Sequence, residues 1–300
     1  MNRIWQVSGL LSHALSTVVL LLLFGCGGGG DGTTSATQGV ISGTAVKGPV
    51  SGATVTAYAI SNGATGGQIT STTTDAQGNF SLSMGSYSGP VMLQMSGGTY
   101  AEEATGQTVT MASDVMTAVI PSFSSGATIS GIQMTPLTSM AQTMALHMAG
   151  GLTDANISAA NTAVGNYFTV SDILHTQPLN PLTSSSTNGA TQAMINYGMV
   201  LAAMSQYAKD QGLISSSSLV TAMLNDASDG VMNGNKVGGS QISMGGMMGG
   251  GSMTMPSTAG TSDLASAMTA FMNSSSNNSG LTPADMSALI QKLGTSSGQI

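Results

Sequence analysis

Apolar residues follow two different periods along the chain, and the change falls near residue 135. From residue 39 they alternate with polar residues in short runs, as at Phe80, Leu82 and Met84. This alternation is typical of half-buried strands. From residue 136 the apolar residues recur every three or four positions, which is typical of amphipathic helices. The pattern therefore predicts a β region followed by an α region.

Runs of β-branched and apolar residues predict the strands of the first region, and turns containing glycine or proline separate them. In one such turn, Asp75 is expected to bond to the nearby backbone and Gly78 to adopt a positive φ. Many short strands with frequent turns favour an antiparallel β-sandwich over residues 39–134. The expected strands span residues 40–46, 53–60, 68–74, 79–84 and 91–95, with weaker candidates at 108–111, 117–120 and 128–132.

Short apolar stripes predict roughly six helices in the second region, and these favour an all-α helical bundle over residues 135–300. Thr153 is a good N-cap, and Gly212 ends the longest stripe in the manner of a C-cap. The stretch 237–260 is rich in methionine and glycine and has no such period, so a disordered loop is expected there. The expected helices span residues 137–148, 154–167, 191–210, 219–227, 263–272 and 286–293.

Three segments of the β region match one known pattern in order. Residues 41–46 form a first strand, residues 48–55 a corner with Gly and Pro, and residues 74–80 read Thr-Asp-Ala-Gln-Gly-Asn-Phe. Together they resemble the carboxypeptidase regulatory-like family, which has the prealbumin (transthyretin-like) fold. The corner lacks the usual residue between its Gly and Pro. The resemblance implies a prealbumin-like antiparallel sandwich that serves as a spacer or binding module and has no shared active site.

The first 25 residues have the three parts of a secretory signal: a positive residue, an apolar core and a small residue before the cut. Leu23-Phe24-Gly25-Cys26 resembles the lipobox of bacterial lipoproteins. The resemblance implies cleavage before Cys26 and acylation of that cysteine, because several acyl chains hold a protein on a membrane. A retained membrane-spanning helix is the alternative, but the strongly apolar part is short against the ~20 residues needed.

Residues 26–38 are expected to form a tether rich in glycine, serine and threonine. Gly27 follows the cysteine where some lipoproteins have aspartate, and this resembles lipoproteins sorted to an outer membrane. The sequence thus predicts a lipid-anchored protein of the bacterial cell envelope, attached to its membrane through Cys26.

Charge and composition exclude several functions. Charged residues make up 6% and hydrophobic residues 41% of the 300 residues, so a core is possible while hydroxyl and amide groups form much of the surface. After Cys26 the chain keeps four lysines and all 12 acidic residues, a formal charge of −8. No basic patch for nucleic acid can be assembled from so few cations. Acylation of the only cysteine leaves no thiol for a disulfide, a metal or a nucleophile.

Methionines in the stretch 237–260 are the main candidates for chemistry. Thioether sulfur is a soft ligand that selects Cu(I), so a periplasmic Cu(I)-binding protein is one alternative function. The other reading is that methionine fills cores in a chain that contains 23 of them. No other metal and no cofactor is expected. The five candidates are Met244, Met247, Met248, Met253 and Met255.

Other polar patterns are weaker. Asp226, Asp229, Asn233 and Asn235 form an oxygen-rich group, but their order does not fit a calcium-binding EF-hand, and a helix-ending turn explains them more simply. Residues 294–298 fit the G-x-S-x-G pattern, but a nucleophile elbow needs a strand before the serine, and here a polar tail surrounds it.

The histidines and the adjacent glutamates do not form a recognisable metal site or catalytic site either. His147 and His175 each lack a second histidine at metal spacing. Glu102 and Glu103 are adjacent, so on a strand they would point to opposite faces, the wrong arrangement for a catalytic carboxylate pair. We therefore expect a non-enzymatic envelope protein with a structural or binding role, as a spacer, adhesin or accessory subunit. A hydrolase is the second alternative.

Overall fold

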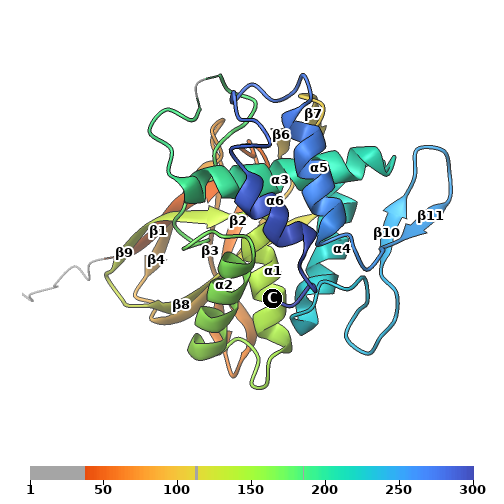
Figure 1. The fold of residues 1–300 in the computed structure, drawn as a ribbon. Helices are drawn as coiled ribbons and strands as arrows, with labels where there is room; N and C mark the ends of the chain where they lie inside the picture. Colours follow the sequence, from red (N-terminus) through yellow and green to blue (C-terminus); the bar gives the residue numbers. More distant parts are fainter. Residues whose placement is uncertain (1–37, 112–113, 185) are drawn as a thin grey trace, which may run out of the picture. The chain divides into compact units, whose positions relative to one another are not determined.

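The computed structural model describes residues 38–300 except 112–113 and 185. These residues belong to one compact unit that contains both strands and helices, so the expected mixed β and α class is confirmed (Figure 1). The expected signal peptide, the acylated Cys26 and nearly all of the tether lie outside the described residues. Within the described part, no helix combines the length and apolar character needed to cross a membrane.

The β region contains two main sheets. A three-stranded sheet has the order β4-β1-β9, and a four-stranded sheet has the order β3-β2-β5-β8. Strand β1 is antiparallel to β4 and parallel to β9, whereas all pairs in the larger sheet are antiparallel. Strands β6 and β7 form a separate antiparallel pair. The strands are β1 (Gly39–Ala45), β2 (Thr54–Ser61), β3 (Ala64–Thr73), β4 (Asn79–Gly85), β5 (Gly89–Ser96), β6 (Thr99–Ala101), β7 (Thr108–Thr110), β8 (Val115–Phe123) and β9 (Thr128–Met134).

Side chains from both sheets share one hydrophobic cluster. Ile41 of the smaller sheet and Leu93 of the larger sheet are fully buried in it. Phe80, Leu82 and Met84 are buried in the same cluster, while the residues between them on β4 are exposed. The alternation that predicts a half-buried strand over residues 79–84 is therefore confirmed.

The turn before β4 has the predicted chemistry. Asp75 Oδ1 accepts hydrogen bonds from the backbone N–H groups of Gln77 (2.9 Å) and Asn79 (2.8 Å). Gly78 has a φ of +81°, and a Cβ there would lie 2.6 Å from the Ala45 carbonyl oxygen. Glycine is needed at this position both for the left-handed backbone and for the close approach to β1.

Six α-helices follow in the described residues, close to the expected ranges (Figure 1). Thr153 and Thr191 cap two of them by accepting hydrogen bonds from the N–H groups of Asn156 and Met194. The helices are α1 (Pro136–His147), α2 (Asp154–Tyr167), α3 (Gln192–Asp210), α4 (Ser216–Asp226), α5 (Ser262–Met272) and α6 (Ser287–Gly294), with a 3₁₀ turn η1 (Ala227–Asp229).

The helices pack against the four-stranded sheet. Met92 and Val119, on the sheet face opposite Leu93, belong to a second hydrophobic cluster together with Leu137 and Tyr197 from the helices. Both faces of β8 are covered, and its residues 116–120 are all buried. The strands and helices on either side of the expected boundary at 134/135 therefore share this second core.

A short polar motif joins the two regions at that boundary. Thr135 caps α1 by a capping box with Thr138, and its hydroxyl lies 2.5 Å from the Tyr197 hydroxyl of α3. The Thr138 hydroxyl donates to the Thr117 carbonyl of β8 (2.8 Å), and Ser139 Oγ accepts from the Thr117 N–H (2.8 Å). The start of α1 is thereby fixed to both β8 and α3.

The expectation of a disordered loop over residues 237–260 is wrong. The segment contains a hairpin of β10 (Ser243–Gly246) and β11 (Ser252–Thr254), which projects beside α4 (Figure 1). Met244 and Met255 are buried in the helical core. The glycines between the methionines hide the strand pattern in the sequence, but the two buried side chains hold the segment against the helices.

Candidate functional site

Three ionisable side chains meet at the buried boundary between the strands and the helices. The Lys47 ammonium donates hydrogen bonds to Glu102 Oε1 (3.2 Å) and Glu103 Oε2 (3.0 Å). The side chains are only 3%, 11% and 3% exposed, respectively. We call Lys47, Glu102 and Glu103 the buried triad. Buried charges are costly unless they are paired, so this arrangement marks a site of interest.

The two glutamates converge because they do not lie on a strand. Strand β6 ends at Ala101, and Glu102 and Glu103 lie in the turn that follows it. Their expected separation onto opposite faces is therefore wrong. Alternation holds only in extended backbone, and the tight turn brings both carboxylates to Lys47. Lys47 itself follows β1, in the turn whose Gly48 has a φ of +63°.

Helix residues bind one member of the triad. Glu102 Oε1 accepts a hydrogen bond from the Ser205 hydroxyl of α3, and Glu102 Oε2 accepts one from the Ser216 hydroxyl of α4 (2.5 Å). The Tyr100 hydroxyl donates to the same Oε2 at 3.3 Å. In contrast, among the described residues Glu103 has one side-chain hydrogen-bond partner, Lys47. Glu102 is thus well satisfied, whereas Glu103 depends on a single shared cation.

The environment moves the pKa values of the two glutamates in opposite directions. Burial raises the pKa of Glu103, and the single contact with Lys47 does not outweigh it. Burial also acts on Glu102, but Lys47 and the Ser205 and Ser216 hydroxyls outweigh it and lower its pKa. Burial alone would lower the pKa of Lys47, but the nearby glutamates hold it above its ordinary value. Lys47 and Glu102 therefore carry full charges, and Glu103 retains a proton more readily than a free glutamate.

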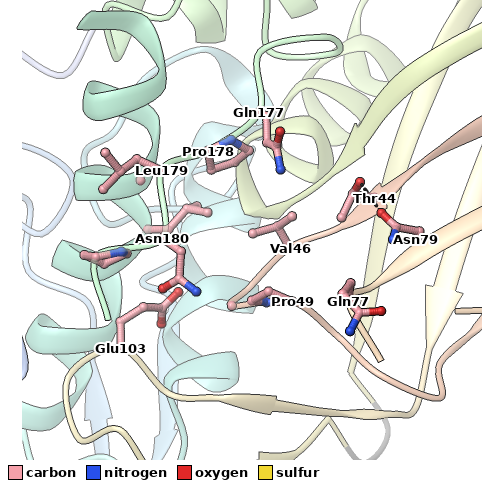
Figure 2. A pocket seen from close by; sticks show the side chains of 14 residues that line it. Thr44, Val46, Pro49, Gln77, Asn79, Glu103, Gln177, Pro178, Leu179 and Asn180 are labelled. Carbon is pink, nitrogen blue, oxygen red and sulfur yellow. Dashed lines mark hydrogen bonds between the residues drawn. The ribbon is translucent and has the colours of Figure 1, made fainter. Parts of the chain in front are cut away.

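A pocket of about 350 Å³ opens beside the triad, with Glu103 in its wall (Figure 2). We call it the junction pocket, because strands line one side and helical elements the other. Residues 177–181, in the loop before α3, line the other side together with Gly198 and Leu201 of α3. The strand side consists of Thr44, Val46, Gly48, Pro49, Gln77 and Asn79. The volume lies in the range of small-molecule sites.

Close packing holds the helical wall of the junction pocket. The Leu179 N–H donates to the Met194 carbonyl at 3.0 Å. A Cβ on Gly198 would lie 2.1 Å from the Leu179 carbonyl oxygen, so only glycine lets the loop lie directly on α3. Four side-chain amides add polar groups to a lining that is otherwise largely apolar. They are Gln77, Asn79, Gln177 and Asn180.

The five candidate methionines do not share one environment. Met244 and Met255 are buried core residues, and Met247 and Met253 pack partly buried against the same core. Met248 is 76% exposed. Core packing accounts for the first two thioethers, and Cu(I) binding by this segment stays a prediction.

The oxygen-rich group at Asp226 is a helix-ending turn. Fully buried Asp226 accepts hydrogen bonds through Oδ1 from the N–H groups of Asn233 (2.8 Å) and Gly234 (2.7 Å). Its Oδ2 has no hydrogen-bond partner among the described residues. Burial raises the pKa of Asp226 to about 6. Asp229 and Asn233 each bond to a nearby backbone N–H.

The two histidines among the described residues form hydrogen bonds outside the triad. His147 Nδ1 lies 2.8 Å from the Thr143 carbonyl of its own helix. His175 Nδ1 lies 2.8 Å from Asp172 Oδ2, and both side chains are about half exposed. That pair lines a separate pocket of about 350 Å³ together with Ser122 and Ser158. Across the described residues, no three His, Cys, Asp or Glu side chains are grouped as a metal site would need.

The serine of the G-x-S-x-G match follows helix α6. Ser296 Oγ donates to the Tyr167 hydroxyl at 3.3 Å, and the backbone before it is helical rather than extended. A nucleophile elbow requires a strand there, so this serine has the wrong setting for that role.

Comparisons with known proteins show only weak likeness, among solved structures. No family model and no curated protein matches the chain. Among solved structures, the 9R-lipoxygenase from Cyanothece PCC8801 aligns with a TM-score of 0.22 and 9% sequence identity. The alignment covers 66% of this chain, and the chain spans about a quarter (26%) of the lipoxygenase. A likeness at this level carries no argument about fold or activity.

Proposed function

We propose that this protein is a lipid-anchored component of the bacterial cell envelope that binds a small polar molecule in the junction pocket and does not transform it. One observation carries the binding role: the buried Glu103 and four side-chain amides line a pocket of about 350 Å³. Pockets of this size with a few placed polar groups are the usual form of ligand sites. The anchoring rests on the sequence around Cys26, with the outer membrane as its place.

A prealbumin-like sandwich for residues 39–134 is part of the proposal. The three-stranded and four-stranded sheets that share one core support it, as does the turn at Asp75–Gly78. The parallel pairing of β1 with β9 is a departure from an all-antiparallel sandwich. The helices of residues 135–300 would form the second part of the protein, and the junction pocket would lie where the two parts meet.

Metabolic labelling tests the anchor. Cells that express the full chain are grown with labelled palmitate, and a Cys26→Ser variant is the matched control. We expect label in the wild-type protein and none in the variant, because the acyl chains need this thiol. Label that survives in the Cys26→Ser variant would rule out the proposed anchor.

A fragment screen by ligand-observed NMR tests the pocket. Gln177 is exposed in the pocket wall, so Gln177→Trp should fill the pocket from its rim without entering the core. Gln68 is exposed on β3, away from the pocket, and Gln68→Trp is the matched control. We expect polar fragments that bind the wild type and Gln68→Trp but not Gln177→Trp. A screen with no fragment sensitive to Gln177→Trp would refute the binding role.

A hydrolase is the second candidate, and the pair Asp172–His175 favours it. Asp172 orients the imidazole through Nδ1, and hydroxyl side chains line the same pocket. A histidine held in this way can accept a proton from a nucleophile. An esterase screen should compare the wild type with His175→Ala. Activity that disappears in the variant would establish the hydrolase, and a silent wild type would remove it.

A further inference from the structure

We infer that the junction pocket takes a small organic cation, a protonated amine, whose charged group binds the Glu103 carboxylate. The inference rests on the proposed binding role of this pocket and names the chemical class of the ligand. Two observations carry it: the charge balance of the buried triad and the neutral lining of the pocket around Glu103.

When both glutamates are ionised, the buried triad has one positive and two negative charges. Lys47 is the one cation that forms a salt bridge with either glutamate among the described residues. The Lys209 ammonium binds the Ala104 carbonyl (2.9 Å) and forms no ion pair with them. Glu102 accepts hydrogen bonds from two serine hydroxyls in addition to Lys47, so the uncompensated negative charge lies on Glu103. Because isolated buried charge is costly, Glu103 favours a second cation.

Glu103 is buried but belongs to the lining of the pocket, so a cation bound there would meet its carboxylate. Among the described residues, no lysine, arginine or histidine lines the junction pocket, and the cation paired with Glu103, Lys47, is not part of the lining. Figure 2 shows the Glu103 carboxylate directed toward Asn180, with Gln77 and Pro49 farther along the pocket. Amide oxygens can accept the remaining N–H groups of an ammonium. Pro49 and Pro178 provide apolar walls for a short methylene chain.

The titration of Glu103 adds an independent signature. Burial raises the pKa of Glu103, Lys47 lowers it in part, and repulsion from the Glu102 charge raises it further. A bound ammonium would favour the carboxylate and lower that pKa. The groups that face Glu103 and share this titration are Lys47, Glu102 and Tyr100, and the pKa of Tyr100 is raised to about 12 by burial. Amine binding should therefore release a proton wherever the Glu103 carboxyl is still protonated in the free protein.

Calorimetry on the full chain in detergent tests the inference. The probes are 1,4-diaminobutane and its uncharged counterpart 1,4-butanediol, at pH 6 in two buffers of different ionisation enthalpy. We expect the diamine to bind at least tenfold more tightly than the diol, with a heat that depends on the buffer. Glu103→Gln removes the charge and keeps the shape, so it should weaken diamine binding at least tenfold. Gln177→Trp should do the same, and Gln68→Trp should leave binding unchanged.

The outcomes separate this inference from the proposed function. Equal binding of the diol and the diamine, lost in Gln177→Trp, would overturn the cation and keep the pocket as a ligand site. Diamine binding that survives both Glu103→Gln and Gln177→Trp would place the cation elsewhere and overturn the inference. Absence of diamine binding overturns it as well, whether or not the fragment screen finds other ligands. If Glu103→Gln fails to fold, Gln177→Trp and the diol comparison still decide the result.

Discussion

Substitution of Asp226 by asparagine should stabilise the protein at neutral pH. The asparagine oxygen can keep the two hydrogen bonds from Asn233 and Gly234, and the substitution removes a charge from a fully buried position. The pKa of Asp226 is raised from 3.8 to about 6, which means that the folded state binds this proton more tightly than the unfolded state. Protonated Asp226 thus contributes to the free energy of unfolding in full below pH ~4, and this contribution is lost as the pH rises through ~6.

The magnitude follows from that shift. At about 1.4 kcal/mol for each pKa unit, ionisation of Asp226 between pH 4.5 and 8 costs the folded state about 2 kcal/mol. Urea unfolding should therefore show the advantage of Asp226→Asn over wild type growing by about 2 kcal/mol across this range. Exposed Asp154 supplies the control, because Asp154→Asn removes the same charge from a position outside the core. An advantage of Asp226→Asn that is the same at both pH values would refute the reasoning.

Three further substitutions test the packing. Lys47→Met leaves two buried glutamates without their cation, so it should lower the free energy of unfolding in urea by about 3–5 kcal/mol. A decrease below ~1 kcal/mol would show that the triad is not buried. Gly198→Ala places a Cβ 2.1 Å from the Leu179 carbonyl oxygen and should lower the free energy of unfolding by about 1–3 kcal/mol. The control is Gly67→Ala, whose Cβ meets no atom within 4 Å and which should be nearly neutral. Met244→Ala should cost about 2–5 kcal/mol and exposed Met248→Ala less than ~0.5 kcal/mol. Replacement of all five candidate methionines by leucine keeps the core volume, and unchanged Cu(I) binding in that variant would rule out the copper alternative.

Local patterns in the sequence predicted most of the elements. The period-two run at residues 79–84 and the stripes of the helices predict which face of an element is buried. Burial follows the pattern in β4 and α2, whereas α3 is buried on every face over residues 196–208. The Asp75–Gly78 turn could be predicted because its bonds join residues at most four apart. The hairpin β10–β11 could not, because its stability comes from Met244 and Met255 packing against distant helices.

The candidate site depends on contacts that no local pattern records. Lys47 and Glu103 are 56 positions apart, and Ser205 reaches Glu102 across 103 positions. The adjacent pair Glu102–Glu103 was visible, but its interpretation required knowing that β6 ends at Ala101. The scarcity of lysine was the one usable signal for the site. The chain has five cations, and a lysine in an apolar turn, as at Lys47, indicates a buried and paired charge.

Native mass spectrometry of the protein released gently from bacterial envelopes tests the central claim most directly. One spectrum reports both the covalent state of the N-terminus and any small molecule held in the junction pocket. We predict a chain that begins at an acylated Cys26 and carries a small amine that is absent from Gln177→Trp and present in Gln68→Trp. A chain that keeps residues 1–25 without acyl groups, or an adduct that persists in Gln177→Trp, would contradict the account.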